Sequence, residues 1–385
     1  MIRLQAPLAD RYTQATDDEL VAMIGAARAT LGERAVILGH HYQRDEVMRW
    51  ADARGDSYGL ARFAANQHEA EYIVFCGVTF MAEAADILTA PHQQVLLPDL
   101  NAGCSMADMA DLAGVETAWS ELGAVVDLDA VVPVTYMNSS AAIKAFVGRH
   151  RGTVCTSANA DAAVRWALGI PYDTPPGPAL AAAAVASGHK VLFFPDQHLG
   201  RNTACALGFG PSAERVWNPH LAGGGLGEAD LKEATFLLWQ GFCSVHQRFT
   251  TDQVAAFRAA HPAGLVVVHP ECAHEVAALA DKVGSTDTII HYVDRAAPGT
   301  AIGIGTEIHL VHRLAEEHPD LSIVSLDPLV CPCSTMFRID PPHLAWVLEG
   351  LVAGEVRNRI VVDEQTAADA RVALERMLEI GGSSF

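Results

Sequence analysis

Short runs of β-branched and aromatic residues recur along this chain, and each is followed by small or polar residues and then by a stretch of helical periodicity. This alternation is typical of β-α-β units, in which helices connect parallel strands. We therefore expect an α/β fold built on parallel sheets. The strands predicted in this way are 35–38, 72–75, 94–97, 131–135, 190–194, 265–268 and 321–324.

The segments that follow these strands carry unusual polar residues in three successive groups, and each group precedes one cysteine, Cys104, Cys243 or Cys333. Ligands of open α/β sheets bind outside the carboxyl ends of the strands, so each group could face a shared centre. Chance similarity between many strand-to-helix turns is the alternative interpretation. The pattern alone leaves both open.

A glycine-rich stretch lies between Ala206 and Ala234 and contains Gly223–Gly227. It lacks the Gly-Lys-Ser/Thr ending of a phosphate-binding P-loop and follows no clear strand. We interpret this stretch as an inserted surface loop.

Charge and hydropathy exclude several classes of protein. The formal net charge is -20, which repels nucleic-acid backbones and anionic lipid, so we expect neither nucleic-acid nor membrane binding. No apolar run is long enough to span a bilayer. The first residues lack the apolar core of a secretory signal, so we expect a reducing cytoplasm and no disulfides among the eight cysteines.

Cys104, Cys243 and Cys333 lie in turns rich in Gly, Ser or Pro, where small neighbours leave room for a bulky inorganic group. They are too far apart in sequence for a zinc knuckle or a ferredoxin-type run, so a shared site needs tertiary convergence. The alternative is packing, because cysteine is often fully buried. We assign Cys76, Cys155, Cys205 and Cys272 to packing.

Polar residues with acid-base or hydrogen-bonding chemistry gather at the predicted strand ends. Singly, each could cap a helix or lie hydrogen-bonded in the core. Capping does not require Tyr or His, however, so together they favour a site in a cleft. These residues are His40, Tyr42, Tyr136, Asn138, His269 and Glu271.

The chain resembles the quinolinate synthase family of de novo NAD biosynthesis, with matches in family order from about residue 36 to residue 336. The matching segments are Ile37–Gln43, Gly55–Ser57, Phe80–Glu83, Pro98–Cys104, Tyr136–Ser140, Cys155–Asn159, Pro195–Gly200, Cys243–His246, Val268–Cys272, Val283–Thr286, Gly305–Glu307 and Cys333–Met336.

The resemblance implies three pseudo-threefold-related α/β/α domains, which we place at 1–118, 119–247 and 248–339, with C-terminal helices of 340–385 packing on the first. It implies one [4Fe-4S] cluster per chain, held by Cys104, Cys243 and Cys333 at the central domain interface. Cys331 competes with Cys333, which we prefer because Met336 follows it by three residues, as in the family pattern.

The implied reaction is a dehydrating transferase reaction that condenses iminosuccinate, supplied by L-aspartate oxidase, with dihydroxyacetone phosphate to give quinolinate, phosphate and two waters. Three thiolates leave one iron open as a Lewis acid. The alternatives are another iron–sulfur hydro-lyase acting on a hydroxy-acid and a non-catalytic iron–sulfur oxygen sensor, which would not need the Tyr, His and Glu set.

Carried over by motif position, the expected site has two groups of residues. The catalytic acids and bases are Glu271, Tyr42, His269 and His246. The expected substrate-binding residues are His40, Ser57, Met81, Tyr136, Met137, Asn138, Ser157, His269, Pro270, Glu271, Ser285 and Thr286.

Overall fold

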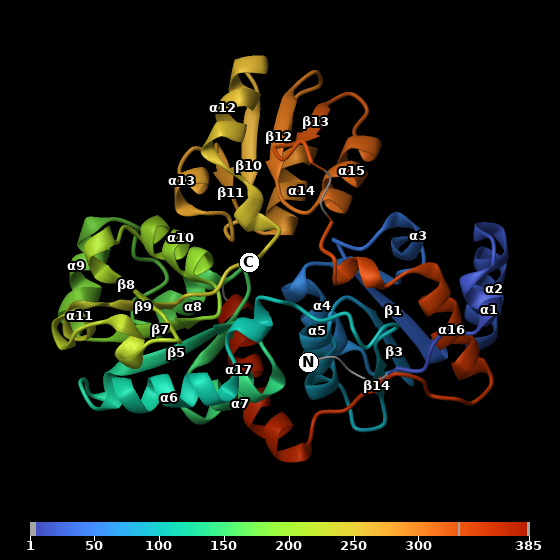
Figure 1. The fold of residues 1–385 in the computed structure, drawn as a ribbon, viewed down its shortest axis with the longest axis horizontal. Coiled ribbons are helices and arrows are strands. Elements are labelled where there is room, and N and C mark those ends of the chain that lie inside the picture. The colour runs from blue at the N-terminus through green and yellow to red at the C-terminus, as the bar shows by residue number, and fades with distance from the viewer. Residues whose placement is uncertain (1–4, 330–331, 383–385) are drawn as a thin grey trace. The chain divides into compact units, whose positions relative to one another are not determined.

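The computed structural model describes residues 5–329 and 332–382, and this part of the chain is an α/β protein with three mainly parallel sheets (Figure 1). The chain divides into two compact units. The first unit contains the chain up to Cys104 together with Glu307–His318 and Leu329–Asp363. The second contains Ser105–Thr306, Pro319–Pro328 and the chain from Glu364 onward.

The first unit holds one five-stranded sheet of order β14-β4-β3-β1-β2, in which only the short edge strand β14 is antiparallel. Its strands are β1 (Ala35–His40), β2 (Ala53–Gly55), β3 (Tyr72–Cys76), β4 (Gln94–Leu96) and β14 (Arg359–Ile360). Its helices are α1 (Asp10–Thr13), α2 (Asp17–Leu31), α3 (Asp45–Met48), α4 (Ser57–Asn66), α5 (Thr79–Leu88), α15 (Ile308–Glu317) and α16 (Pro341–Val352), with 3₁₀ turns η1 (Gly32–Arg34) and η7 (Met336–Arg338).

The second unit holds two wholly parallel sheets, of order β6-β5-β7-β9-β8 and β11-β10-β12-β13. The strands of the five-stranded sheet are β5 (Val131–Tyr136), β6 (Thr153–Cys155), β7 (Lys190–Phe194), β8 (Glu214–Trp217) and β9 (Phe236–Trp239). Those of the four-stranded sheet are β10 (Leu265–Val268), β11 (Lys282–Val283), β12 (Ala301–Gly305) and β13 (Ser322–Ser325).

Helices connect the strands of the second unit. They are α6 (Leu112–Gly123), α7 (Ala141–Arg149), α8 (Ala160–Ala167), α9 (Pro178–Ser187), α10 (Gln197–Leu207), α11 (Glu228–Glu233), α12 (Thr251–Ala260), α13 (His274–Ala277), α14 (Thr286–Asp294) and α17 (Glu364–Gly382). Its 3₁₀ turns are η2 (Ala107–Met109), η3 (Leu128–Ala130), η4 (Pro211–Ala213), η5 (Ala222–Gly225) and η6 (His246–Arg248).

The central strands form the core. Parallel strands covered on both faces read as continuous apolar runs, and β7 and β9 are buried in this way along nearly their whole length. The α/β class predicted from sequence is confirmed, and all seven predicted strands form, with ends that differ by no more than one or two residues. In the described part of the chain, no helix is both long and apolar enough to span a membrane.

The prediction of a surface loop between Ala206 and Ala234 is wrong in part. Glu214–Trp217 forms β8, an edge strand paired with β9, and Trp217 is almost fully buried. The sequence gives little sign of this strand, because Glu214 and Arg215 are charged and glycines lie on both sides of it. Gly224 has a left-handed backbone (φ 66°), and a Cβ there would strike the Trp217 ring, so the glycine run lets the chain turn tightly over that ring.

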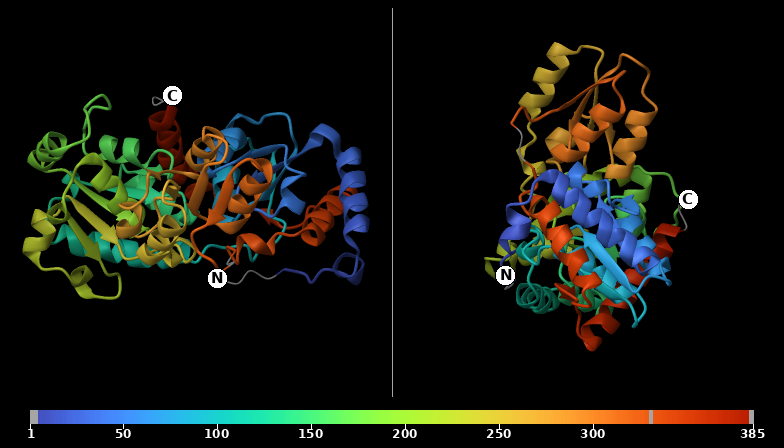
Figure 2. Two further views of the ribbon diagram at one scale, coloured as in Figure 1. Left: turned by 90° about the horizontal axis from the view of Figure 1, so that it is seen from above. Right: turned by 90° about the vertical axis from the view of Figure 1, so that its right-hand side faces the viewer.

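The prediction that all C-terminal helices pack on the first unit is also wrong in part. Helix α16 packs on α2 (Figure 2), but α17 packs on α7 in the second unit (Figure 1). The reason is an apolar stripe on α17 that needs a close partner: Ala370, Ala373, Leu374, Met377 and Ile380 are buried. Gly148 allows α7 to approach this closely, because a Cβ at that position would lie only 1.9 Å from the Asp369 carbonyl oxygen of α17.

Candidate active site

The predicted site residues divide between the two units. The first unit contains His40, Tyr42, Ser57, Met81, Cys104 and Cys333. The second unit contains Tyr136, Met137, Asn138, Ser157, Cys243, His246, His269, Pro270, Glu271, Ser285 and Thr286.

A chain of hydrogen bonds in the second unit joins four buried side chains. Tyr136, the last residue of β5, donates its hydroxyl to Oε1 of Glu271 at 2.5 Å. The other carboxylate oxygen lies 2.8 Å from Nδ1 of His246, whose Nε2 lies 3.2 Å from the Thr306 hydroxyl. Glu271 follows β10, so two parallel strands of different sheets bring the pair together at their carboxyl ends.

The electrostatic surroundings of Glu271 keep its carboxylate ionised. Burial opposes this, but the adjacent His246 imidazole and the bond from Tyr136 outweigh it and hold the pKa of Glu271 well below its usual range. Burial lowers the pKa of His269 to about 3, so this ring is neutral near pH 7. The two imidazoles stack with centroids 4.5 Å apart. Glu271 can therefore act as a base whose position is set from both sides.

Asp196 is a buried acid that the sequence reasoning left unassigned. Its Oδ1 accepts from the N–H groups of His198 and Leu199 and so caps α10, while Oδ2 is buried with no partner among the described residues. Burial, with the charge of Glu271, raises the pKa of Asp196 well above its usual range. Two buried carboxyl groups whose pKa values are shifted in opposite directions thus interact with each other, an arrangement that can separate an acid from a base. The sequence signal that could have identified Asp196 as a site residue was its position just after the predicted strand 190–194.

The turn after β5 carries Met137 and Asn138 and ends at Ser140, which caps α7 through its hydroxyl. Met137 donates its N–H to the Cys155 carbonyl, and the Ser139 hydroxyl donates to the Tyr136 carbonyl. Asn138 Oδ1 is buried without a hydrogen-bond partner among the described residues. An amide held in this way can accept a donor from a bound molecule.

A second set of polar groups lies at the start of α14. Ser285 caps this helix by accepting from the Thr288 N–H, and Thr286 is buried with its hydroxyl unpartnered among the described residues. Ser157, Pro270 and Gly284 line a cavity of about 420 Å³ in the same unit. Free backbone N–H groups and hydroxyls at a helix start suit an anion.

The described cysteines fall into two classes of exposure. Cys76, Cys155 and Cys272 are fully buried, and burial raises the pKa of Cys76 to about 12 and raises those of the other two. These three fit the packing interpretation. Cys205 does not, because it is half-buried and lines the 420 Å³ cavity. The predicted ligands are likewise half-buried: Cys104, Cys243 and Cys333.

Cys243 lies next to the acid-base group. The Sγ atom of Cys243 and one ligand atom each of His246 and Glu271 all lie within 4.8 Å of one another. These donor types suit a metal centre with an adjacent base. His246 follows Cys243 by three residues and is the first residue of η6, so this turn fixes the backbone of the histidine.

In the first unit, His40 is buried at the end of β1, and its Nδ1 accepts from the Tyr42 N–H at 3.2 Å. Ser57 begins α4, and Met81 is buried in α5. Cys333 donates its N–H to Glu307 Oε1 at 3.1 Å, and burial raises the pKa of its thiol. Cys331, the competing thiol, lies outside the described residues.

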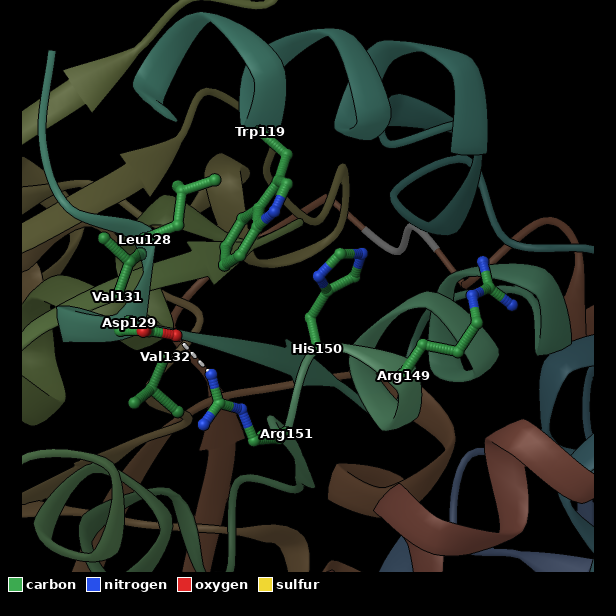
Figure 3. A pocket seen from close by; sticks show the side chains of 8 residues that line it. All are labelled: Trp119, Leu128, Asp129, Val131, Val132, Arg149, His150 and Arg151. Atoms are coloured by element: carbon green, nitrogen blue, oxygen red, sulfur yellow. Dashed lines mark hydrogen bonds and ion pairs between the residues drawn. The ribbon is translucent and has the colours of Figure 1, made fainter. Parts of the chain in front are cut away.

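A second cavity, of about 400 Å³, lies elsewhere in the second unit (Figure 3). Trp119, His150, Arg151 and the first residues of β5 line it, and Arg151 pairs with Asp129. None of the predicted site residues lines this cavity. It adjoins the amino end of β5, whereas the predicted residues follow the carboxyl ends of strands.

Buried acid-base groups at the carboxyl ends of parallel strands define an α/β enzyme. The chain belongs to the quinolinate synthetase A protein family, whose sequence profile matches residues 23–174 and 178–379. It is 53% identical over 376 residues to a quinolinate synthase of Corynebacterium glutamicum, covering 98% of this chain and 91% of that one. It is 55% identical to one of Nocardioides, covering 96% and 91%, and 48% identical to one of Listeria monocytogenes, covering 98% of both chains.

Proposed function

We propose that this protein is a quinolinate synthase that condenses iminosuccinate with dihydroxyacetone phosphate to give quinolinate, phosphate and two waters. Family membership supports the reaction class. The structural observation that carries the proposal is the Glu271 carboxylate, held by Tyr136 and His246 beside the Cys243 thiol. Enolising a ketose phosphate and removing two waters needs such a base.

The cysteines fit the cluster that the family resemblance implies. Cys104, Cys243 and Cys333 are half-buried, and the glycines and serines around them leave room for an inorganic group. They would hold one [4Fe-4S] cluster per chain. When bound, such a cluster with three protein thiolates supplies an open iron as a Lewis acid for a departing hydroxyl group.

Within this function, Glu271 takes the proton that each dehydration removes from carbon. His246 can carry that proton onward, because its two nitrogens contact Glu271 and Thr306. Tyr136 orients the carboxylate through its hydrogen bond to Oε1, and His246 is the group that exchanges a proton with the carboxylate. The neutral His269 ring can accept or donate a hydrogen bond to substrate. Tyr42 and His40 are assigned the remaining acid and orienting roles from the first unit.

Substrate anions are assigned to the unpartnered polar groups. Ser285, Thr286 and the first N–H groups of α14 suit a phosphate, and Ser157 supports them from the same cavity region. Asn138 suits a carboxylate or imine group of the dicarboxylate. Ser57, Met81, Met137 and Pro270 complete the proposed substrate contacts.

The test is an anaerobic assay of cluster-reconstituted protein with dihydroxyacetone phosphate and iminosuccinate generated in place by an L-aspartate oxidase, the partner that the reaction requires. Formation of quinolinate with one phosphate released per turnover supports the proposal. Dehydration of a hydroxy-acid without quinolinate points to another hydro-lyase, and a cluster that responds to oxygen without any turnover points to a sensor. Either result overturns the proposal.

A further inference from the structure

Three turns that carry proposed site residues share one hydrogen-bond pattern. In each turn, a buried side chain from a helix donates to the backbone carbonyls of the residues immediately before and after a site residue. The donors are Lys144, Asn202 and Arg313, and the bracketed residues are Asn138, Glu271 and Tyr42 respectively.

Lys144 brackets Asn138. The whole residue is 0% exposed, and its ammonium donates to the Met137 carbonyl at 2.8 Å and to the Ser139 carbonyl. Lys144 lies one turn into α7, so the loop between β5 and α7 folds back over its side chain. Burying an ammonium group is unfavourable unless hydrogen bonds satisfy it, so the loop conformation and the buried lysine depend on each other.

Asn202 brackets Glu271 in the same way. Its Nδ2 donates to the carbonyls of Pro270 at 2.8 Å and Cys272 at 2.9 Å, and its Oδ1 lies 2.9 Å from Nδ1 of His274. Because Nδ2 serves two carbonyls, the orientation of the amide is fixed and His274 must donate to Oδ1. All polar atoms of the buried Asn202 side chain are therefore used to hold the turn around Glu271.

Arg313 brackets Tyr42 within the first unit. Its two terminal nitrogens donate to the carbonyls of His41 at 3.0 Å and Gln43 at 2.6 Å, and its Nε pairs with Asp45. The planar fork of a guanidinium suits two carbonyls at a fixed spacing. The donor again comes from a helix, α15, that is distant in sequence from the turn.

We propose that Lys144, Asn202 and Arg313 are positioning residues, each of which aims one site side chain by fixing the carbonyls on both sides of it. The proposal rests on the proposed function, since it is that function which assigns roles to Asn138, Glu271 and Tyr42. Peptide units are planar, so fixing the two carbonyls restricts the backbone rotations that direct the side chain between them.

The chain supplies a matched control. Lys190 donates to the carbonyls of Lys232 and Ala234, which flank the exposed Glu233, a residue with no proposed role in the site. Lys190→Met therefore removes the same kind of contact without disturbing a site residue.

The main experiment is a set of double-mutant cycles in the cluster-loaded enzyme. Asn202→Leu should lower kcat by about 10- to 100-fold with little change in KM, as expected for a misplaced catalytic group. In a Glu271→Gln background it should add no further loss, because it acts through Glu271. Arg313→Met should behave in the same way toward Tyr42→Phe, and Lys144→Met should raise KM but not in an Asn138→Ala background.

If a variant does not fold, Asn202→Ala, Arg313→Lys or Lys144→Gln replaces it. Additive losses in the cycles, or equal losses in Lys190→Met, overturn the proposal by showing a merely structural role. Amide hydrogen exchange gives a readout independent of the reaction. Exchange in peptides covering 41–44, 137–140 and 269–273 should rise only in the variant that brackets each turn, and unchanged exchange in all three variants also overturns the proposal. A wild-type enzyme that makes no quinolinate contradicts the proposed function but leaves this exchange test intact.

Discussion

Tyr136 and Glu271 are 135 positions apart in sequence, yet the tyrosine hydroxyl lies 2.5 Å from the glutamate Oε1 inside a buried part of the second unit. This contact joins the carboxyl ends of β5 and β10, the first strand of one sheet along the chain and the first strand of the next. It places a hydroxyl and a carboxylate side by side at the carboxyl ends of two parallel sheets.

Replacing Glu271 by Gln should abolish most turnover. Gln keeps the size and hydrogen-bonding reach of the side chain but cannot take a proton, so kcat should fall by at least about 10²-fold. Cluster content and the urea midpoint should stay near wild type. Tyr136→Phe should have a smaller effect on kcat, since it removes an orienting bond. Near-normal quinolinate formation by Glu271→Gln would place the base at His246, His269 or Tyr42.

Substituting Ala for Cys104, Cys243 or Cys333 should prevent cluster binding, because we propose that each supplies one ligand. The measurement is iron and sulfide per chain after anaerobic reconstitution. Cys76→Ala and Cys155→Ala are matched controls that should keep the cluster and lose about 1 to 3 kcal/mol of stability. If Cys331→Ala loses the cluster and Cys333→Ala keeps it, the assignment of the third ligand is wrong.

Thr286→Val should separate binding from stability. The Thr286 hydroxyl is buried without a partner among the described residues, so replacing it by a methyl group of similar size should leave the urea midpoint unchanged or higher. The KM for dihydroxyacetone phosphate should rise about 10-fold, the loss expected for one hydrogen bond to a charged group. A clear loss of stability with an unchanged KM would show that the hydroxyl serves the fold.

His269 should make the folded chain sensitive to acid. Its folded pKa is about 3, against an ordinary value of 6.5, so the unfolded chain binds a proton between these limits that the folded chain does not. The contribution of His269 to the free energy of unfolding has its full value above pH 6.5. Below that pH it falls by about 1.4 kcal/mol per pH unit. Urea unfolding of cluster-free protein between pH 7 and 5 should show this slope, reduced in His269→Gln and unchanged in the exposed control His291→Gln. Equal slopes in all three proteins would contradict the prediction.

Gly148→Ala should weaken the contact of α17 with α7. The added Cβ would overlap the Asp369 carbonyl oxygen, so the helices must separate, at a cost of about 1 to 3 kcal/mol in the free energy of unfolding. Gly210→Ala is the control, because a Cβ there meets no atom within 4 Å. A stability equal to that of the control would mean that α17 adjusts without loss.

Most of the strands that sequence analysis identified are buried apolar runs, such as Lys190–Phe194. Several of those it missed carry little local signal: Ala301–Gly305 alternates isoleucine with glycine, and Glu214–Trp217 is a half-polar edge strand. Phe236–Trp239 was missed although it is apolar and fully buried, because four apolar residues after a helix fit either a strand or a helix. The pairing of these strands depends on their neighbours in the sheet.

The site residues likewise divide into those that the sequence could identify and those that it could not. Residues that follow predicted strands, such as Tyr136 and Glu271, could be named from position and resemblance, but their contact depends on two sheets coming together. Lys144 and Asn202 were missed because each looks like an ordinary polar residue within a helix. The signal for Lys144 was its place among apolar neighbours that α7 buries, in a chain with only four lysines.

The order in which the chain contributes to its two units has a consequence for its synthesis. The second unit begins at Ser105 but takes its last helix, α17, from Glu364 onward, after the chain has returned to the first unit. Nearly the entire polypeptide must therefore be synthesised before the apolar stripe of α17 can cover α7. Until then α7 has no partner on that face, so a stop codon just before Glu364 should yield an aggregating product rather than a shortened enzyme.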